Sequence, residues 1–306
     1  MIAALIASVL VTFPAENQKL PVTDRTYVIG AADTNRRDRL YLNGVEVDVY
    51  GTGAFLAMVR TRPGTNTLEF VQGTNVLVRS FTVQASSSTP TAAVGLSKPR
   101  DPYADLGISS NTVFAAKPPK GSRPCDLHVV VDAGHGGKDS GALSPRGFRE
   151  KDMNLRQAES LAGELRRAGF KVTMTRENDS FVPLYDRPKL AVRAKADLLV
   201  SIHHNSTAPG RNPREVRHTV TYASNAAGLA LAGAIQRRIA CAVAQVKNAG
   251  AKMKSLAVCR NPAVPSCLVE VDFINLPEGE ESSLDPVRRK NVSRAIVEGI
   301  LDWLYE

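Results

Sequence analysis

Three side chains in the second half of the chain are of types that bind metal ions. His135 follows a short apolar run in DAGHGG, and His203 ends another apolar run in SIHHNS. Glu150 stands in GFREKDMNL, directly before apolar residues with helical spacing. Two imidazoles and one carboxylate are the usual protein ligands of a catalytic zinc, and they leave one position for water. The pattern predicts a single Zn²⁺ held by His135, Glu150 and His203, with metal-assisted hydrolysis as its chemistry.

A fourth candidate, Glu270, lies inside the apolar stretch CLVEVDF. A carboxylate among Val, Leu and Phe is costly to desolvate unless it is paired or takes part in chemistry. We expect Glu270 to accept a proton from a zinc-bound water and to return it to a leaving amine. Because side chains alternate along a strand, Asp272 should share the face of Glu270. There Asp272 either raises the pKa of Glu270 by like-charge repulsion or lies beyond the site.

The elements that must position these groups alternate between strand and helix from residue 125 to residue 306. Apolar runs indicate strands, and helical spacing of apolar residues indicates helices, in this order: strand 127–131, a helix after Glu150 that stops at Gly169, strand 171–175, helix 184–194, strands 197–203 and 218–222, helix 226–243, strand 268–273 and helix 286–304. This alternation predicts an α/β catalytic domain with an open, mostly parallel sheet and helices on both faces. Functional groups gather at the carboxyl ends of such strands, where His135 and His203 fall.

The first part of the chain has a different pattern. Residues 20–84 alternate apolar and polar side chains around turns such as Asn43-Gly44, which predicts a small, sandwich-like all-β domain. Residues 85–124 are rich in Ser, Pro, Ala and Lys and are interpreted as a linker that holds the two parts apart. Residues 1–19 are either a signal segment or a first strand.

Composition excludes some classes of protein. The net charge of +9 is spread along the 306 residues, which argues against a dedicated nucleic-acid-binding arm. No apolar run reaches the roughly 18 residues that a transmembrane helix needs, so we expect no membrane span. The four cysteines have no C-x-x-C spacing, which argues against a structural zinc site. Cys259 and Cys267 either form a disulfide in an oxidising compartment or remain free and buried.

Residues 127–305 resemble the zinc-dependent N-acetylmuramoyl-L-alanine amidases of the type 3 family. The matching stretches are VVVDAGHGGKDSGA, KDMNL with Glu150 before it, VTMTRENDSFVPLYDR, AVRAKADLLVSIHHNS and PSCLVEVDFI. The resemblance implies that His135, Glu150 and His203 are the zinc ligands and that Glu270 is the catalytic carboxylate. It also implies hydrolysis of the amide bond between N-acetylmuramic acid and L-alanine in bacterial peptidoglycan. Asp272 departs from the family, which usually has Gly there, but no departure removes a ligand.

The resemblance also sets expectations for the residues around the site. Six further side chains match family positions and are interpreted as groups that support the ligands or pack around them: Asp139, Asn154, Arg176, Asp179, Arg187 and Asn205. Asn205 is the best candidate among them for a substrate contact. His204 should point away from His203, and His128 and His218 are interpreted as structural.

The resemblance further implies peptidoglycan as the partner, a monomer, and a periplasmic or extracellular location at the cell wall. The stretch NGVEVDVYGTGAF resembles the immunoglobulin-like modules of secreted bacterial enzymes, which favours a spacer or a weak wall-binding role. Two other hypotheses are a zinc peptidase that cuts elsewhere in the stem peptide and a non-catalytic wall-binding protein on the same fold. Some relatives carry a helix that blocks the zinc. The residues from Val246 to Pro265 leave little room for one, so we expect residues 125–306 alone to have an open site.

Overall fold

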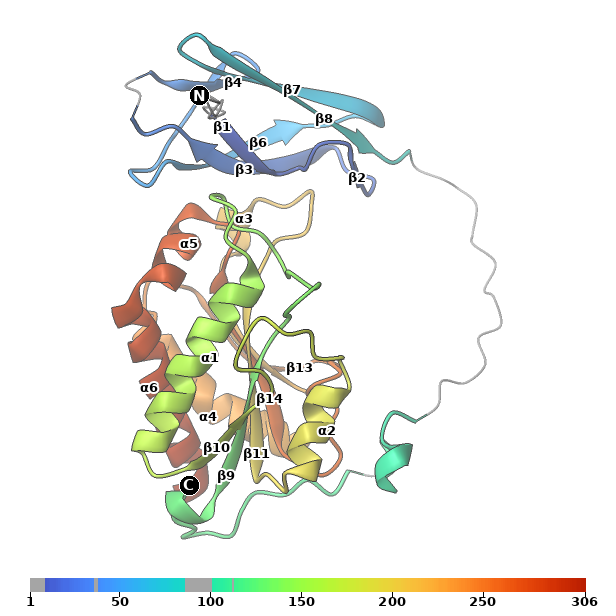
Figure 1. Cartoon of the computed structure of the whole chain (residues 1–306), viewed down its shortest axis with the longest axis vertical. Coiled ribbons are helices and arrows are strands. Elements are labelled where there is room, and N and C mark those ends of the chain that lie inside the picture. The colour runs from blue at the N-terminus through green and yellow to red at the C-terminus, as the bar shows by residue number, and fades with distance from the viewer. Residues whose placement is uncertain (1–8, 36–37, 86–100, 112) are drawn as a thin grey trace, which may run out of the picture.

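The computed structural model describes residues 9–35, 38–85, 101–111 and 113–306. An all-β lobe precedes residue 86, and an α/β lobe follows residue 124 (Figure 1). The predicted fold class, an α/β domain preceded by a small all-β domain, is confirmed. None of the helices in the described ranges is both long enough and apolar enough for a bilayer span.

The all-β lobe consists of two sheets that enclose an apolar core. One sheet has the order β1 (Val9–Phe13), β3 (Arg25–Ala32), β6 (Ala54–Arg60), and the other has the order β2 (Gln18–Leu20), β8 (Asn75–Val83), β7 (Gly64–Gln72), β4 (Leu40–Leu42), β5 (Val45–Val47). Phe55, Phe70 and Phe81 are fully buried between them. β1 lies within residues 1–19 and pairs with β3, which agrees with the alternative of a first strand in that segment. Residues 1–8 of the proposed signal segment lie outside the described ranges.

The α/β lobe is built on one six-stranded sheet. Its order is β10 (Lys171–Met174), β9 (His128–Ala133), β11 (Leu198–Asn205), β14 (Ser266–Phe273), β12 (Thr219–Ala223), β13 (Asn248–Met253). The first four strands are parallel, and β12 runs antiparallel to β14. The strands β9, β11 and β14 are apolar almost throughout, because both faces of the sheet are covered.

Helices cover both faces of this sheet, as predicted. One face packs against α1 (Glu150–Arg167), α4 (Ala226–Ala242) and α6 (Pro286–Tyr305), and the other packs against α2 (Asp186–Arg193). Val129 and Val131 of β9 face the three-helix layer, and Val130 between them faces α2. Two short helices, α3 (Pro213–Val216) and α5 (Pro277–Leu284), lie near the all-β lobe (Figure 1).

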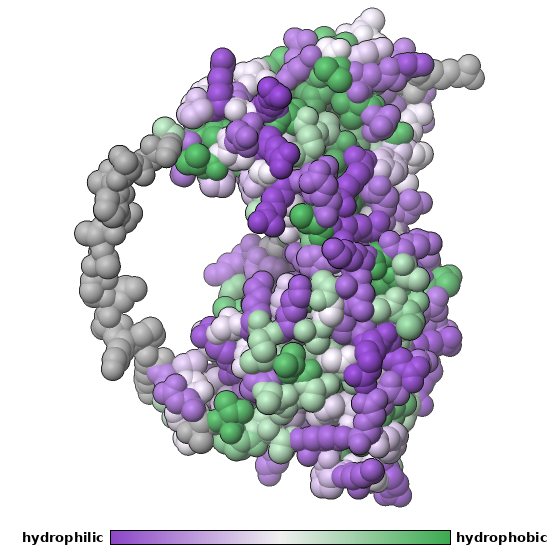
Figure 2. Space-filling model, turned by 180° about the vertical axis from the view of Figure 1, so that it is seen from behind, coloured by the Kyte–Doolittle hydropathy of each residue, from purple (hydrophilic) through white to green (hydrophobic). Residues whose placement is uncertain are grey.

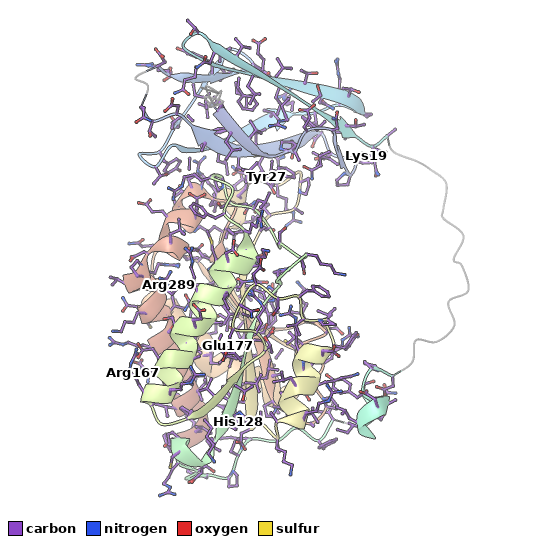
Figure 3. The ribbon with its side chains drawn as sticks, in the orientation of Figure 1. Lys19, Tyr27, His128, Arg167, Glu177 and Arg289 are labelled. Atoms are coloured by element: carbon purple, nitrogen blue, oxygen red, sulfur yellow. The ribbon has the colours of Figure 1, made fainter. Side chains whose placement is uncertain are left out.

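The two lobes pack against each other, which corrects the expectation that the linker holds them apart. Tyr27, Ile29 and Leu56 of the all-β lobe form one buried cluster with Phe273, the last residue of β14, and Leu276, which follows it. Figure 3 shows Tyr27 where the lobes meet. Seen from behind, the lobes touch along a surface where hydrophilic residues predominate (Figure 2). Composition could not reveal this contact, because the apolar residues that make it are ordinary strand residues in the sequence.

Polar contacts surround this apolar cluster. The Tyr27 hydroxyl donates to the Thr207 carbonyl oxygen at 2.8 Å. The Thr12 hydroxyl donates to the Pro145 carbonyl oxygen at 3.2 Å, in the loop that leads to Glu150. Tyr50 donates to the Glu278 carboxylate and accepts from Arg214 at 2.7 Å. The all-β lobe thus contacts both the loop before α1 and the segment after β14.

The described part of the predicted linker also lies against the α/β lobe. Tyr103 is fully buried, and Asp105 pairs with Lys189 at 2.8 Å on α2. The backbone amides of Phe114 and Ala115 donate to the Pro262 carbonyl oxygen at 2.8 and 2.9 Å. Residues 101–111 and 113–124 are therefore an ordered flank of the α/β lobe, and residues 86–100 lie outside the described ranges.

All four cysteines are free. Of the two alternatives for Cys259 and Cys267, the structure has the free and buried thiols. Burial raises the pKa of Cys259 to about 12, so this thiol stays protonated at neutral pH and contributes to packing in the core.

The contact between the lobes predicts a large stability cost for Tyr27→Ala. This change removes a buried ring and the hydrogen bond to Thr207, so we expect the free energy of unfolding to fall by about 3 kcal/mol. Denaturant titration of the full chain measures it. The matched control is Tyr41→Ala in the same lobe, where the ring is 37% exposed and the loss should stay below about 1 kcal/mol. Equal losses from the two variants would contradict docking through Tyr27.

Candidate metal centre

Three parts of the α/β lobe bring the predicted ligands together. His135 follows β9, Glu150 is the first residue of α1, and His203 lies near the carboxyl end of β11. One ligand atom from each of the three lies within 4.8 Å of the others. Glu150 Oε1 is 3.1 Å from His135 Nε2 and 3.0 Å from His203 Nδ1. A carboxylate between two imidazole nitrogens is a donor set that suits a zinc ion.

Glycines create the space that this cluster needs. A Cβ atom on Gly134 would lie 2.2 Å from His203 Nε2, so any side chain there would displace the imidazole. A Cβ atom on Gly141 would lie 2.6 Å from Glu150 Oε2, and the φ of +63° at Gly141 also favours glycine. His135 itself has a φ of 60°, a strained conformation for a residue with a side chain. The glycine-rich loop therefore serves close packing around the ligands.

The ligands determine each other's protonation. Burial opposes ionisation of Glu150, yet hydrogen bonds and charges from His135 and His203 hold its pKa well below the usual range. Burial lowers the pKa of His135, but Glu150 and Asp139 outweigh it and raise that pKa to about 9. Glu150 is therefore an anion between two imidazoles. A dication can replace protons at such a site.

A further carboxylate and an amide orient the ligands. Asp139 Oδ2 is 2.8 Å from His135 Nδ1, an arrangement in which that nitrogen donates and Nε2 is left to bind a metal. Asn154, one turn along α1, donates to Glu150 Oε1 at 3.2 Å and to the Gly134 carbonyl oxygen at 3.3 Å. Both residues support the ligands, as the sequence interpretation proposed.

Two buried arginines hold the loop that carries His135. Arg187 donates to the carbonyl oxygens of Ala133 and His135, each at 2.8 Å. Arg176 donates to the carbonyl oxygen of Gly134 at 2.9 Å and to that of Lys151 at 2.8 Å. Arg176 thereby joins the loop after β9 to the first turn of α1, so the positions of His135 and Glu150 depend on the same side chain.

Two further charged residues help to hold the ligands and the loop after β9, and the sequence analysis did not identify them. Asp132 is fully buried on β9, where it accepts from Thr175 and Ser201 at 2.6 Å each and from Arg187 at 2.8 Å. A carboxylate inside the apolar stretch VVVDA is the same signal that singled out Glu270. The second is Lys151, which pairs with Asp179 at 2.5 Å; Asp179 in turn accepts from the Gly137 amide at 2.7 Å.

Glu270 lies beside the cluster. It is in register with His203 on the neighbouring strand, and both residues line one cavity of about 540 Å³ together with His135. Glu270 Oε2 is buried and has no hydrogen-bond partner among the described residues. Burial raises the pKa of Glu270 to about 7. A buried carboxylate oxygen without a partner, on the wall of the cavity that holds the three ligands, is placed to exchange a proton with a group inside it.

Asp272 does not join this site. The register between β11 and β14 shifts between His203 and Asn205, with one extra residue on β14, so simple alternation beyond Glu270 was a wrong assumption. Asp272 is fully buried and accepts from Arg217 at 2.9 and 2.8 Å and from Arg288 at 2.8 Å. Burial opposes its ionisation, but these arginines hold its pKa below the usual range. Of the two alternatives, Asp272 lies beyond the site.

Asn205 is not among the described residues that line the cavity either. Its side chain accepts from the amide of Ser206 at 2.8 Å.

The remaining histidines have structural partners. His204 Nδ1 is 2.8 Å from Asn154 Oδ1, and His128 Nε2 is 2.9 Å from Thr173 Oγ1. Burial lowers the pKa of His204 to about 4, so it is neutral at neutral pH.

The cavity has no helix that covers it from the segment before β14. The fully described residues from Val246 to Pro265 form β13 and turns without a helix, as expected. Ser255, Leu256, Ala257 and Val258 from this segment line one side of the cavity.

Comparison with known proteins connects this geometry to a family. The probable cell wall amidase LytH of Staphylococcus saprophyticus is 31% identical over 206 residues, which are 67% of this chain and 66% of that protein. The endolysin of Bacillus phage SPP1 is 40% identical over 151 residues, 48% of this chain and 55% of the endolysin. The chain thus spans two-thirds or less of the length of these relatives.

Solved structures are similar to the α/β lobe. The N-acetylmuramoyl-L-alanine amidase AmiC2 of Nostoc punctiforme is 34% identical with a TM-score of 0.55, over 59% of this chain and 98% of that one. An N-acetylmuramoyl-L-alanine amidase of Clostridium difficile 630 is 31% identical with a TM-score of 0.55, over 58% and 96%. The family profile of N-acetylmuramoyl-L-alanine amidases matches residues 129–302, which contain all three ligands and Glu270. The chain therefore belongs to the amidase 3 family of N-acetylmuramoyl-L-alanine amidases.

Proposed function

We propose that this protein hydrolyses the amide bond between N-acetylmuramic acid and L-alanine in bacterial peptidoglycan, and that it uses one zinc ion. The observation that carries the proposal is the cluster of His135, Glu150 and His203 with the unpartnered Glu270 carboxylate in the same cavity. Family membership and the names of the relatives support the substrate and the bond.

The donor set fits zinc better than a hard cation. Two imidazole nitrogens and one carboxylate oxygen lie within 4.8 Å of one another, whereas calcium and magnesium prefer oxygen ligands throughout. Asp139 leaves His135 Nε2 free to bind the ion. When bound there, zinc would polarise the scissile carbonyl group and lower the pKa of water toward about 7.

Glu270 would move the proton. Its Oε2 atom is buried on the cavity wall without a partner, and burial brings its pKa to about 7, near the value at which a carboxylate both accepts and returns a proton. In this role Glu270 accepts a proton from the attacking water and then returns it to the amine of L-alanine. His203 and Glu270 stay in register because β11 and β14 pair directly.

The proposed substrate indicates where the enzyme acts. Peptidoglycan lies outside the cytoplasmic membrane, so we propose a periplasmic or extracellular location at the cell wall. All four proposed site residues come from one chain, so a monomer would suffice. The segment from Val246 to Pro265 contains no helix that could block the cavity, so the full chain should need no activating partner.

Digestion of purified peptidoglycan tests the proposed bond. The full chain alone should release new amino termini on L-alanine, and a zinc chelator should stop the release. Mass spectrometry and end-group analysis of the products identify the cut. New amino termini on other residues of the stem peptide would point to a zinc peptidase, and wall binding without any cut would point to a non-catalytic protein.

Two substitutions separate metal binding from proton transfer. His203→Ala removes one of three protein ligands, so both bound zinc and activity should be lost. Glu270→Gln keeps the size of the side chain but accepts no proton, so zinc should remain near one equivalent while turnover falls by roughly 10²–10⁴-fold. Metal analysis and initial rates on the same preparations measure both effects.

Matched controls are available for each change. His128→Ala removes a histidine whose partners are Thr173 and the Ala194 carbonyl oxygen, so zinc should be retained. Glu177→Gln changes an exposed carboxylate and should leave the rate unchanged. Both control residues are labelled in Figure 3. A folded, zinc-loaded Glu270→Gln variant with a normal rate would remove Glu270 from the mechanism.

A further inference from the structure

A second cavity adjoins the one that holds the ligand cluster. Its volume is about 700 Å³, and it shares Ser255 and Arg260 with the metal-site cavity. Tyr185 at the start of α2 lines it on one side, and Tyr103 lines it on another. A substrate that extends away from the ligand cluster past Arg260 would enter this second cavity.

A segment before the family domain builds one wall. Residues 101–111 precede the matched range of 129–302, and they lie beside α2 in Figure 1. Asp105 pairs with Lys189 at 2.8 Å and with Arg193 at 3.2 Å, which fixes the segment to α2. Tyr103 is fully buried and anchors it. One wall of the cavity therefore comes from residues outside the matched range.

The groups that remain available in the cavity are hydrogen-bond donors. Arg260 is exposed, and its guanidinium lies 5.7 Å from the Tyr185 ring and donates to the Tyr185 hydroxyl at 2.8 Å. That hydroxyl keeps its own proton to donate, and Ser255 is exposed beside Arg260. The Tyr103 hydroxyl oxygen is buried and has no partner among the described residues. A buried hydroxyl without a partner is unfavourable, and at a cavity wall it indicates a ligand group that completes it.

Two acceptor groups of the same cavity, on Asp101 and Asn261, are already in use. The Asp101 carboxylate accepts from the Tyr103 amide at 3.0 Å and from the Ser110 amide and hydroxyl at 2.7 and 3.0 Å. Asn261 Oδ1 accepts from the amides of Ala263 and Val264 at 3.1 Å each. One guanidinium and several hydroxyl donors, with the oxygens of Asp101 and Asn261 occupied, suit a carboxylate ligand.

We propose that this second cavity binds the acidic peptide branch of the substrate, with a peptide carboxylate on Arg260. The proposal rests on the proposed amidase function, because the scissile amide must lie at the ligand cluster for the peptide to enter the neighbouring cavity. The segment 101–111 then contributes to the preference of the enzyme among stem peptides. Arg260 and Tyr103 are the residues that determine this preference.

Two soluble substrates of equal size test the carboxylate contact. One is N-acetylmuramoyl-L-alanyl-D-glutamate with free carboxylates, and the other is the same compound with both carboxylates amidated. Arg260→Gln should raise KM for the acidic substrate about 10-fold, equivalent to about 1.4 kcal/mol. KM for the amidated substrate and kcat for both should stay within about 2-fold, a difference worth less than about 0.5 kcal/mol. Arg294 is an exposed arginine on α6, away from the cavity, so Arg294→Gln should leave KM and kcat unchanged for both substrates.

If Arg260→Gln raised KM equally for both substrates, or raised it for neither, the proposal would be overturned. Tyr103→Phe gives a second variant that keeps the anchoring ring. Because the Tyr103 hydroxyl has no partner among the residues that the structure describes, its removal should not lower the melting temperature, but it should raise KM for the acidic substrate. An unchanged KM would remove Tyr103 from the site.

Direct binding separates this proposal from the amidase assignment. The dipeptide L-alanyl-D-glutamate has no sugar and lacks the amide bond to N-acetylmuramic acid. It should bind the zinc-loaded full chain in a calorimetric titration and bind Arg260→Gln about 10-fold more weakly. If the wild-type chain releases no L-alanine termini from the wall yet binds this dipeptide through Arg260, the amidase function fails and the cavity assignment stands. If the wall is cut but the dipeptide does not bind, the cavity assignment fails alone.

Discussion

The carboxylate of Glu150 between the imidazoles of His135 and His203 is the interaction on which the rest of the structure depends. Glu150 is 5% exposed, and both histidines lie within 3.1 Å of one of its oxygens. Such a buried anion is stable only with partners that offset its desolvation. The strand order of the sheet supplies them, because β9 and β11 are neighbours and α1 begins beside their carboxyl ends. Arg176 and Asn154 then tie the loop after β9 to α1.

The parts outside the family domain are attached close to this centre. Thr12 of the all-β lobe bonds to the loop before Glu150, and the apolar contact at Tyr27 packs on the end of the strand of Glu270 and on Leu276 after it. The segment 101–111 packs on α2, whose Arg187 holds the carbonyl oxygen of His135. The all-β lobe and the segment 101–111 thus pack on the elements that carry the ligands. A displacement of either part would therefore shift the positions of the ligands.

Much of the fold and the site could be predicted from the sequence, because the signals were local. Apolar runs marked β9, β11 and β14, and His135, Glu150 and His203 stood at their ends or at a helix start. The failures have physical causes. The extra residue on β14 turned Asp272 away from Glu270, and no alternation rule reveals such a bulge. The strand β13, in NAGAKM, and the helix α5, in PEGEESSL, lack apolar periodicity and were missed. The ordered flank at 101–111 and 113–124 was interpreted as a linker, because composition does not reveal that Tyr103 is buried against the α/β lobe.

The central claim is that zinc binds two histidines and one glutamate of this chain, and X-ray absorption spectroscopy at the zinc edge tests it most directly. The account predicts nitrogen and oxygen scatterers at about 2.0–2.2 Å, with imidazole outer-shell features from two histidines and no sulfur. Loss of one imidazole contribution in a His135→Ala variant that still holds some zinc would agree with that assignment. Sulfur scatterers at about 2.3 Å in the wild-type protein would place the metal on the free cysteines and contradict the account.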